Sequence, residues 1–252
     1  MEWHKGQEQF NDNPPRMIFC LTTGRSGTAY LAQVMATVPN VQSRHEPPPG
    51  WYAEQTRPYQ ERLDWLLEEK LPTIDRITWQ GDTYMESANQ INQGFIEPLL
   101  EIGVPFDAIW LKRDTQEVAV SFWRKAIIPG RTSLAWHMPP DHEDNILRAK
   151  RWAHWTDYTC CLWLAMEKEA RNEKYAPMIR QAGGQVVETT TGEIISEAGF
   201  MKLLADLDLP MPNGQYHEVK NRKFNASSEA QYKSWPPEGF GKQREWILND
   251  VC

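Results

Sequence analysis

A glycine-rich turn with the sequence GRSGT (residues 24–28) joins an apolar run to an amphipathic segment near the start of the chain. Residues 17–21 are almost continuously apolar, which is typical of a parallel strand covered on both faces. The apolar residues of 30–38 recur at helical spacing. A strand, a glycine turn and a helix in this order aim backbone N–H groups and the helix dipole at one point. The pattern therefore predicts an anion-binding site, to which Arg25 adds a full positive charge.

The turn differs from the loop that binds nucleoside triphosphates. That loop, G-x-x-x-x-G-K-[ST], has more widely spaced glycines and a lysine before its hydroxyl residue. In this chain Arg25 stands between the glycines, and no lysine follows Gly27. We therefore expect an anionic nucleotide other than ATP with magnesium, held by consecutive residues of the turn. They are Thr23, Gly24, Arg25, Ser26, Gly27, Thr28 and Ala29.

The turn resembles a loop of the PAPS-dependent sulfotransferases, which transfer a sulfuryl group from 3′-phosphoadenosine 5′-phosphosulfate (PAPS). GRSGT is similar to their loop for the 5′-phosphosulfate, in particular to the carbohydrate-type and bacterial members, which carry arginine at the position of Arg25. Glu46 and Pro47 resemble the Glu-Pro pair that follows the first helix in the carbohydrate-type members. The resemblance implies a P-loop-like sulfotransferase fold and PAPS as co-substrate. It also implies a hydroxyl, less often an amine, as acceptor on a carbohydrate or small metabolite.

A second stretch, residues 107–124, resembles the segment with which this family holds the 3′-phosphate of the nucleotide. In that pattern a strand ends in an arginine, here Arg113, and a serine, here Ser121, follows eight residues later. Many members carry proline where this chain has Thr115. Arg113 also falls at the carboxyl end of an expected strand, where open α/β sheets bind ligands.

The departure at Thr115 costs little, because Asp114 and Glu117 can form a capping box at the start of the following helix. One alternative to this second motif is that Arg113 pairs with Asp114 or Glu117 on the surface, which would leave Ser121 an ordinary helix residue. Lys112 is expected to point to the opposite side of the strand from Arg113, because strand side chains alternate.

A third stretch, residues 219–228, loosely resembles a basic loop that closes over the nucleotide in this family. Arg222 and Lys223 would then cap the bound nucleotide. A short basic cluster is equally compatible with a solvated face of the molecule.

Deprotonation of an acceptor requires a base, and Glu46 is the first candidate. It ends an expected second strand beside the turn and matches the glutamate of the Glu-Pro pair. His45 is the second candidate, because histidine serves this role in the small-molecule class of the family. Strand alternation predicts that only one of the two reaches the cleft. Weaker candidates are His137, His154 and Glu86.

The order of the remaining elements predicts an α/β fold in three layers, with a mostly parallel central sheet flanked by helices. We expect a loosely held polar leader at residues 1–15 and a single domain at residues 16–252. Further strands are expected at 40–44, 77–84, 106–112 and 184–190. Helices are expected at 59–70, 87–102, 115–127, 145–180 (broken near 172–177), 196–207 and 243–251. A long loop at 128–144 is expected to line the substrate site.

The composition excludes several classes of function. A net charge of −7 over 252 residues argues against nonspecific binding of nucleic acid. The four cysteines lack the spacing of a metal site, and no Asp, His or Cys cluster has it either, so we expect no metal. The chain shows no signal peptide and no membrane-length apolar run, which favours a cytoplasmic protein. Several of the twelve tryptophans fall in residues 110–163. They could form the wall of an aromatic cleft or be large residues of the core.

Two other functions compete with sulfuryl transfer. A kinase-like enzyme would need a lysine in the loop and a magnesium-binding aspartate after an apolar strand, and neither is evident. A non-catalytic protein that binds adenosine bisphosphates or glycans would need the same anion site but no base. Turnover of ATP would identify the first, and binding without any sulfated product would identify the second.

Overall fold

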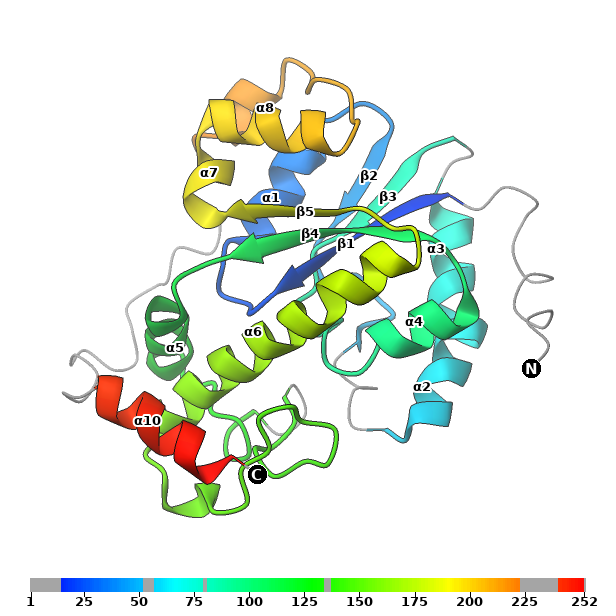
Figure 1. Cartoon of the computed structure of the whole chain (residues 1–252). Helices are drawn as coiled ribbons and strands as arrows, with labels where there is room; N and C mark the ends of the chain where they lie inside the picture. Colours follow the sequence, from blue (N-terminus) through cyan, green and yellow to red (C-terminus); the bar gives the residue numbers. More distant parts are fainter. Residues whose placement is uncertain (1–14, 52–56, 79–80, 134–136, 223–239, 252) are drawn as a thin grey trace.

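The computed structural model describes residues 15–51, 57–78, 81–133, 137–222 and 240–251 of the chain. In these residues one parallel sheet has the strand order β2-β3-β1-β4-β5 (Figure 1). The strands are β1 (Arg16–Thr22), β2 (Val41–Arg44), β3 (Thr83–Glu86), β4 (Phe106–Lys112) and β5 (Val186–Thr190). Helices cover both faces of the sheet, so the expected three-layer α/β fold is confirmed.

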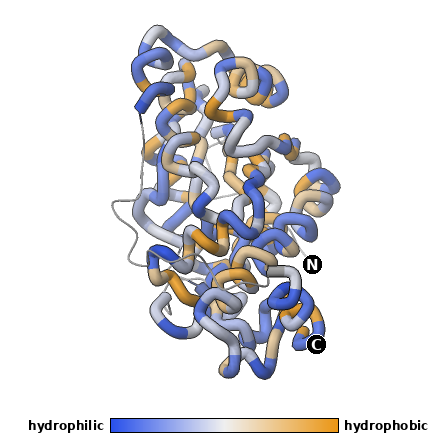
Figure 2. Tube along the Cα trace, turned by 90° about the vertical axis from the view of Figure 1, so that its left-hand side faces the viewer, coloured by the Kyte–Doolittle hydropathy of each residue, from blue (hydrophilic) through white to orange (hydrophobic). Residues whose placement is uncertain are grey.

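Alternate side chains of the central strand divide the core between the two faces. Phe19 belongs to a cluster with α2 (Tyr59–Trp65), α3 (Leu71–Ile77), α4 (Ile96–Ile102) and α6 (Asp157–Gln181). Ile18 and Cys20 belong to a cluster with α1 (Thr28–Met35), α7 (Thr191–Ile195), α8 (Glu197–Asp206) and α9 (Tyr216–Val219). Along these helices hydrophobic and hydrophilic positions alternate, because only one side of each helix faces the sheet (Figure 2).

A third apolar cluster lies beside the sheet. It joins α5 (Thr115–Arg124), the first half of α6 and α10 (Phe240–Asp250), which lies beside the start of α6 (Figure 1). The Thr159 hydroxyl of α6 donates a hydrogen bond of 3.0 Å to the Gln243 side chain of α10. The thiols of Cys20, Cys160 and Cys161 are free and buried, and burial raises the pKa of Cys20 to about 12.

The strand order creates a crevice at one edge of the sheet. β1 leads through α1 to the outer strand β2, whereas β4 leads through α5 and α6 to the opposite outer strand β5. β1 and β4 are neighbours in the sheet, with Thr22 of β1 beside Leu111 of β4. Connections that leave adjacent parallel strands in opposite directions open a ligand-binding crevice beyond their carboxyl ends.

The strand expected at 77–84 is displaced toward the C-terminus, because α3 extends to Ile77 and β3 spans Thr83–Glu86. The helix expected at 59–70 continues through a π-helical segment (Leu66–Lys70) into α3, which ends at Ile77. Pro72 has no N–H for the regular helical ladder, and the wider π-helical turn before it lets the helix continue. The strand begins only at Thr83.

The helix expected at 87–102 is correct only for Ile96–Ile102. Gly94 has a φ of 92°, and a methyl group there would lie 2.9 Å from the guanidinium carbon of Arg62. Asn92 bonds instead to the carbonyl of Thr22 at 3.1 Å and to Asn172 of α6 at 2.7 Å. The turns of residues 87–95 are therefore stabilised by tertiary hydrogen bonds rather than by a helical ladder.

The helical region expected at 145–180 is shorter at its start and unbroken at its end. Turns and a short 3₁₀ helix (Trp152–His154) precede α6, whose N-cap Thr156 accepts a hydrogen bond from the N–H of Thr159. Pro177 lies inside α6 without ending it. The neighbouring Tyr175 is buried against the sheet, and this packing offsets the cost of the proline.

The other expected elements lie close to the observed ones. α5 ends at Arg124 rather than at 127, β5 begins at Val186 rather than at 184, and α10 begins at Phe240 rather than at 243. Asp114 caps α5 by accepting from the N–H of Glu117 at 2.9 Å. Residues 1–14 of the expected leader and residues 223–228 of the expected basic loop, including Lys223, lie outside the described residues.

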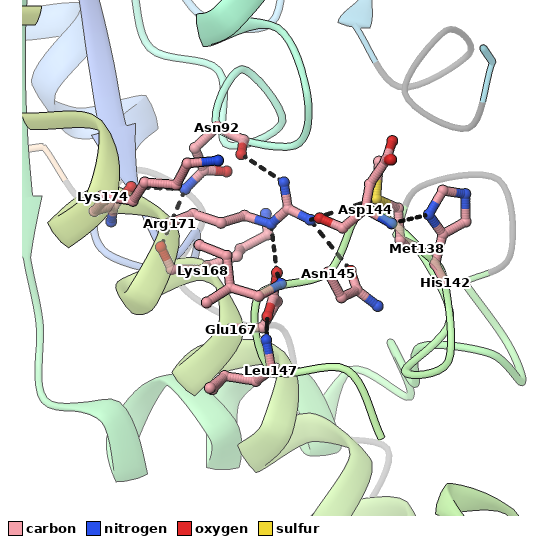
Figure 3. A network of polar contacts seen from close by, with 12 residues as sticks. Asn92, Met138, His142, Asp144, Asn145, Leu147, Glu167, Lys168, Arg171 and Lys174 are labelled. Atoms are coloured by element: carbon pink, nitrogen blue, oxygen red, sulfur yellow. Dashed lines mark hydrogen bonds and ion pairs between the residues drawn. The ribbon is translucent and has the colours of Figure 1, made fainter. Parts of the chain in front are cut away.

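A buried ion pair on α6 holds the loop that precedes this helix (Figure 3). Arg171 and Glu167 lie 2.5 Å apart, and both side chains are almost fully buried. Glu167 also accepts from the N–H of Leu147 at 2.6 Å, and Arg171 donates to the carbonyls of Asp144 at 2.7 Å and Asn92 at 3.3 Å. The pair thus joins α6 to two segments without regular structure.

Arg171→Met should lower the free energy of unfolding by about 3–5 kcal/mol, because it leaves the Glu167 carboxylate buried without its cation. Lys174→Met on the same helix is the matched control. Lys174 pairs with Glu97 at 2.7 Å but is 47% exposed, so its loss should cost less than about 1 kcal/mol. Urea denaturation of both variants measures the difference, and equal losses would contradict this role of the buried pair.

Candidate functional site

The glycine turn adopts a conformation in which several backbone N–H groups can face one ligand. Gly24, Arg25 and Gly27 have φ values of 81°, 54° and 87°. Gly27 is the N-cap of α1, which begins at Thr28, and it has no side chain that could bond to the N–H groups of the first turn. Free N–H groups at a helix start after a glycine turn form an anion-binding site. Arg25 is in the left-handed region that costs a non-glycine residue about 1–3 kcal/mol, which is typical of functional sites.

The two sequence motifs meet at the carboxyl ends of β1 and β4. Nη1 of Arg113 donates a hydrogen bond of 2.5 Å to the carbonyl of Arg25. Nε of Arg25 in turn donates to the Ser121 hydroxyl at 3.1 Å. Nε of Arg113 also pairs with Glu117 at 3.0 Å, so the surface ion pair forms together with the contact to the turn. The arrangement concentrates two guanidinium groups at one edge of the sheet.

A cavity of about 930 Å³ opens at this edge. Residues from the carboxyl ends of β1, β2, β4 and β5 and from the segments that follow them line it. The predicted residues that line the cavity are Arg25, Gly27, Thr28, Ala29, His45, Glu46 and Arg113. Lys112 lines it as well, although alternation predicted that it points away.

Other predicted residues lie beneath the turn or away from the cavity. The hydroxyls of Ser26 and Thr22 are buried and bonded to each other, and the Thr23 hydroxyl bonds to the carbonyl of Gly24 at 3.2 Å. These buried hydrogen bonds stabilise the conformation of the turn. Arg222 is exposed and does not line the cavity.

Both base candidates reach the cavity, so the expectation that only one does so is wrong. β2 ends at Arg44, and Glu46 has a φ of 46°, which breaks the alternation of a strand. Nδ1 of His45 lies 2.9 Å from the carbonyl of Ser87. A carbonyl only accepts, so Nδ1 donates this hydrogen bond and the lone pair of the ring's basic form lies on Nε2.

The weaker base candidates divide into two groups. Glu86 is buried, pairs with Lys70 at 2.8 Å and accepts from Trp51 and Tyr84, so its carboxylate is occupied by structural contacts. His154 is exposed and away from the cavity. His137 does line the cavity.

His137 has an unusual environment. It is 3% exposed, and within the described part of the chain neither ring nitrogen has a hydrogen-bond partner. Its ring packs edge-on against the ring of Phe122, with 5.7 Å between the two ring centroids. Burial and the nearby Lys168 lower the pKa of His137 well below its usual value, so the ring is neutral near pH 7.

The described tryptophans do not wall the cavity. Trp110 and Trp163 are core residues with 7% and 0% exposure. They belong to apolar core clusters that include residues of α6. Of the two interpretations of the tryptophan-rich region, core packing therefore applies to these residues rather than the wall of a cleft.

Sequence reasoning missed Asn89, Thr191 and Lys168. Asn89 lines the cavity and donates to Glu46 at 2.8 Å. The Thr191 hydroxyl, at the start of α7, donates to the carbonyl of Ser26 at 2.8 Å and fixes the turn against β5. Lys168 stands between Glu167 and Glu169 in a charged stretch of α6, and nothing in its spacing marks it as a buried residue.

Charges around the turn act on one another. Burial and the nearby Arg113 lower the pKa of Arg25, and Glu46 partly compensates. Burial lowers the pKa of Lys168 to about 7, against the attraction of Glu46. Perturbed groups that gather in a cavity are typical of functional sites.

Two solved structures share this fold at low sequence identity. The first, "Sulfotransferase Domain from the Curacin Biosynthetic Pathway", aligns with a TM-score of 0.53 and 11% identity, over 84% of this chain and 80% of its own. The second, "Sulfotransferase Domain from the Synechococcus PCC 7002 Olefin Synthase", aligns with a TM-score of 0.53 and 9% identity, over 85% and 80%. No protein-family model and no curated protein matches the chain. The chain therefore has an α/β fold similar to that of sulfotransferase domains.

Two properties of the described residues bear on cofactors and membranes. No three His, Cys, Asp or Glu side chains among them gather in a way that could hold a metal ion. None of the helices in the described part of the chain is long and apolar enough to cross a membrane.

The stability of the protein should depend on pH through Lys168. Its pKa is about 7 in the folded state and near 10.5 in the unfolded chain, so the unfolded state binds more protons between these values. The unfolding free energy should therefore rise with pH, by at most about 1.4 kcal/mol per pH unit from this group. Lys168→Met should remove this contribution in denaturation series between about pH 7 and 9. Identical slopes in both proteins would contradict the buried lysine.

Proposed function

We propose that this protein is a sulfotransferase that moves the sulfuryl group of PAPS to a hydroxyl of a carbohydrate or other small metabolite. The contact between Arg113 and the carbonyl of Arg25 carries the proposal, because it brings two anion-binding motifs to one cavity. Their spacing in the sequence and the similarity of the fold to sulfotransferase domains support it independently.

The residues of the cavity fit a nucleotide with phosphate groups at both ends. The N–H groups of the turn and of α1, with Arg25, are suited to the 5′ end, and Arg113 to the 3′-phosphate. The resemblance assigns Ser121 to the same phosphate, although Ser121 does not line the cavity and its hydroxyl accepts from Nε of Arg25 at 3.1 Å. When bound, PAPS supplies the sulfuryl group and a phosphate leaving group. Arg25 would stabilise the charge that develops on the leaving oxygen.

Proton removal from the acceptor falls to Glu46 in this proposal, with His45 as the alternative. Glu46 lines the cavity, and one of its carboxylate oxygens accepts from Asn89. A base placed in this way contributes about 10²–10⁴-fold to the rate. His45 lines the same cavity and uses only Nδ1 in its hydrogen bond to Ser87, so the two candidates need separate variants.

Arg113→Ala should weaken binding of adenosine 3′,5′-bisphosphate by about 10- to 100-fold, because one charged hydrogen bond is worth about 1.5–3 kcal/mol. Affinity for adenosine 5′-monophosphate, which lacks the 3′-phosphate, should change by less than about twofold. Titration calorimetry of both ligands makes this comparison.

Arg180→Ala is the matched control for this comparison, since Arg180 pairs with Glu188 on the surface at 3.3 Å and does not line the cavity. Equal losses for both nucleotides in Arg113→Ala would mean that Arg113 only supports the turn through the carbonyl of Arg25.

Glu46→Gln should lower the rate of sulfuryl transfer by about 10²–10⁴-fold and leave the affinity for adenosine 3′,5′-bisphosphate intact. Transfer is measured with ³⁵S-labelled PAPS and a metabolite extract of the source organism, followed by identification of the labelled product. Full activity of Glu46→Gln together with loss of activity in His45→Ala would assign the base to His45. If the unaltered protein labels no product, or turns over ATP with magnesium instead, the proposed function is wrong.

A further inference from the structure

Lys168 is a buried cation that has no carboxylate in contact among the residues that the structure describes. It is 0% exposed, and its ammonium group donates to the carbonyl and to the side-chain oxygen of Asn89, each at 2.6 Å. Lys70, another buried lysine, pairs with Glu86 at 2.8 Å. An ammonium group that is buried without an opposite charge in contact is costly, and a role beyond packing explains why the fold keeps it.

The ammonium group determines which end of the Asn89 amide faces the cavity. A charged lysine offers only N–H donors, so the oxygen of the amide must face Lys168. The NH₂ group then faces the opposite direction, where it donates to Oε1 of Glu46 at 2.8 Å. Lys168, Asn89 and Glu46 thus form one chain of hydrogen bonds from α6 to the cavity.

Asn89 is the point at which this chain meets the turn. A methyl group at Gly24 would lie 3.2 Å from the Asn89 side chain, so Asn89 packs closely against the turn. Glu46 has an exposed side chain and lies in the loop after β2. The hydrogen bond from Asn89 therefore gives its carboxylate a fixed direction.

We propose that Lys168 is a positioning residue that orients the Glu46 carboxylate through the side chain of Asn89. The proposal rests on the function proposed for Glu46. Hydrogen bonds from an ammonium group are about twice as strong as those from a neutral amine, so the orientation of Asn89 is firmest when Lys168 is charged.

The groups around Lys168 place this change near neutral pH. Burial lowers the pKa of Lys168 to about 7, with Glu46 from the loop after β2 opposing and Arg171 from the same helix adding to the effect. His137, from the loop before α6, is a neutral neighbour whose pKa is lowered by burial and by Lys168. Transfer should therefore decline as the pH rises through about 7.

The first test compares Lys168→Met with Lys70→Met. Lys168→Met should lower the rate of ³⁵S transfer from PAPS to the metabolite extract by about 10- to 100-fold, since a misplaced group near the reacting atoms has this effect. It should also remove the step near pH 7 and leave adenosine 3′,5′-bisphosphate affinity unchanged. Lys70→Met breaks a buried ion pair away from the cavity, so it should lower stability but not the rate per folded molecule. An unchanged rate in Lys168→Met would overturn the proposal.

A double-mutant cycle tests whether Lys168 acts through Asn89. Asn89→Ala should lower the transfer rate as much as Lys168→Met does, and the double variant should be no slower than either single one. Effects of residues that act as one chain are not additive. Losses that multiply in the double variant would show that the two residues act separately, and the proposal would be wrong.

A third measurement does not depend on transfer. The side-chain amide signals of Asn89 in a ¹⁵N nuclear magnetic resonance spectrum should shift with a midpoint near pH 7, and Lys168→Met should abolish the shift. Lys70→Met should retain it. If the amide titrates but no label is transferred, the proposed function fails while the coupling of Lys168 to Asn89 stands. If the amide does not titrate, the coupling is absent whatever the enzyme does.

Discussion

The hydrogen bond from Arg113 to the carbonyl of Arg25 is the contact on which the candidate site depends. It forms because β1 and β4 are neighbours in the parallel sheet and end at the same edge. The bond fixes a strained turn against the adjacent strand and brings a second cation to the anion site. A different strand order would separate the two motifs, although each could keep its local conformation.

Helix α6 provides the second constraint, through polar side chains rather than through its apolar face alone. Arg171 and Glu167 hold the preceding loop, Asn172 holds Asn92, and Lys168 holds Asn89. These contacts replace the helical or strand hydrogen bonds that residues 87–95 lack. Buried polar networks of this kind specify one arrangement of loops, which an apolar interface would leave less defined.

Apolar runs and glycine turns were enough to predict four of the five strands near their observed places, because buried parallel strands require such runs, whereas the strand expected at 77–84 begins only at Thr83. β4 was predicted with the correct ends. The glycine turn was marked as a candidate anion site by its local spacing, and the Arg113 segment by its resemblance to a family pattern. Tertiary contacts decided the rest. Glu46 and His45 both reach the cavity because the backbone leaves the strand conformation at Glu46. Lys168 contacts Asn89, 79 residues earlier, and no local pattern encodes that contact.

The central claim is that one cavity binds both ends of a nucleotide with two separate phosphate groups. A crystal structure of the protein with adenosine 3′,5′-bisphosphate tests it most directly. We expect the 5′-phosphate against the N–H groups of Gly27 and Thr28 and the 3′-phosphate beside Arg113 and Ser121. A nucleotide that leaves the turn empty, or binds with its 3′-phosphate away from Arg113, would contradict a shared site.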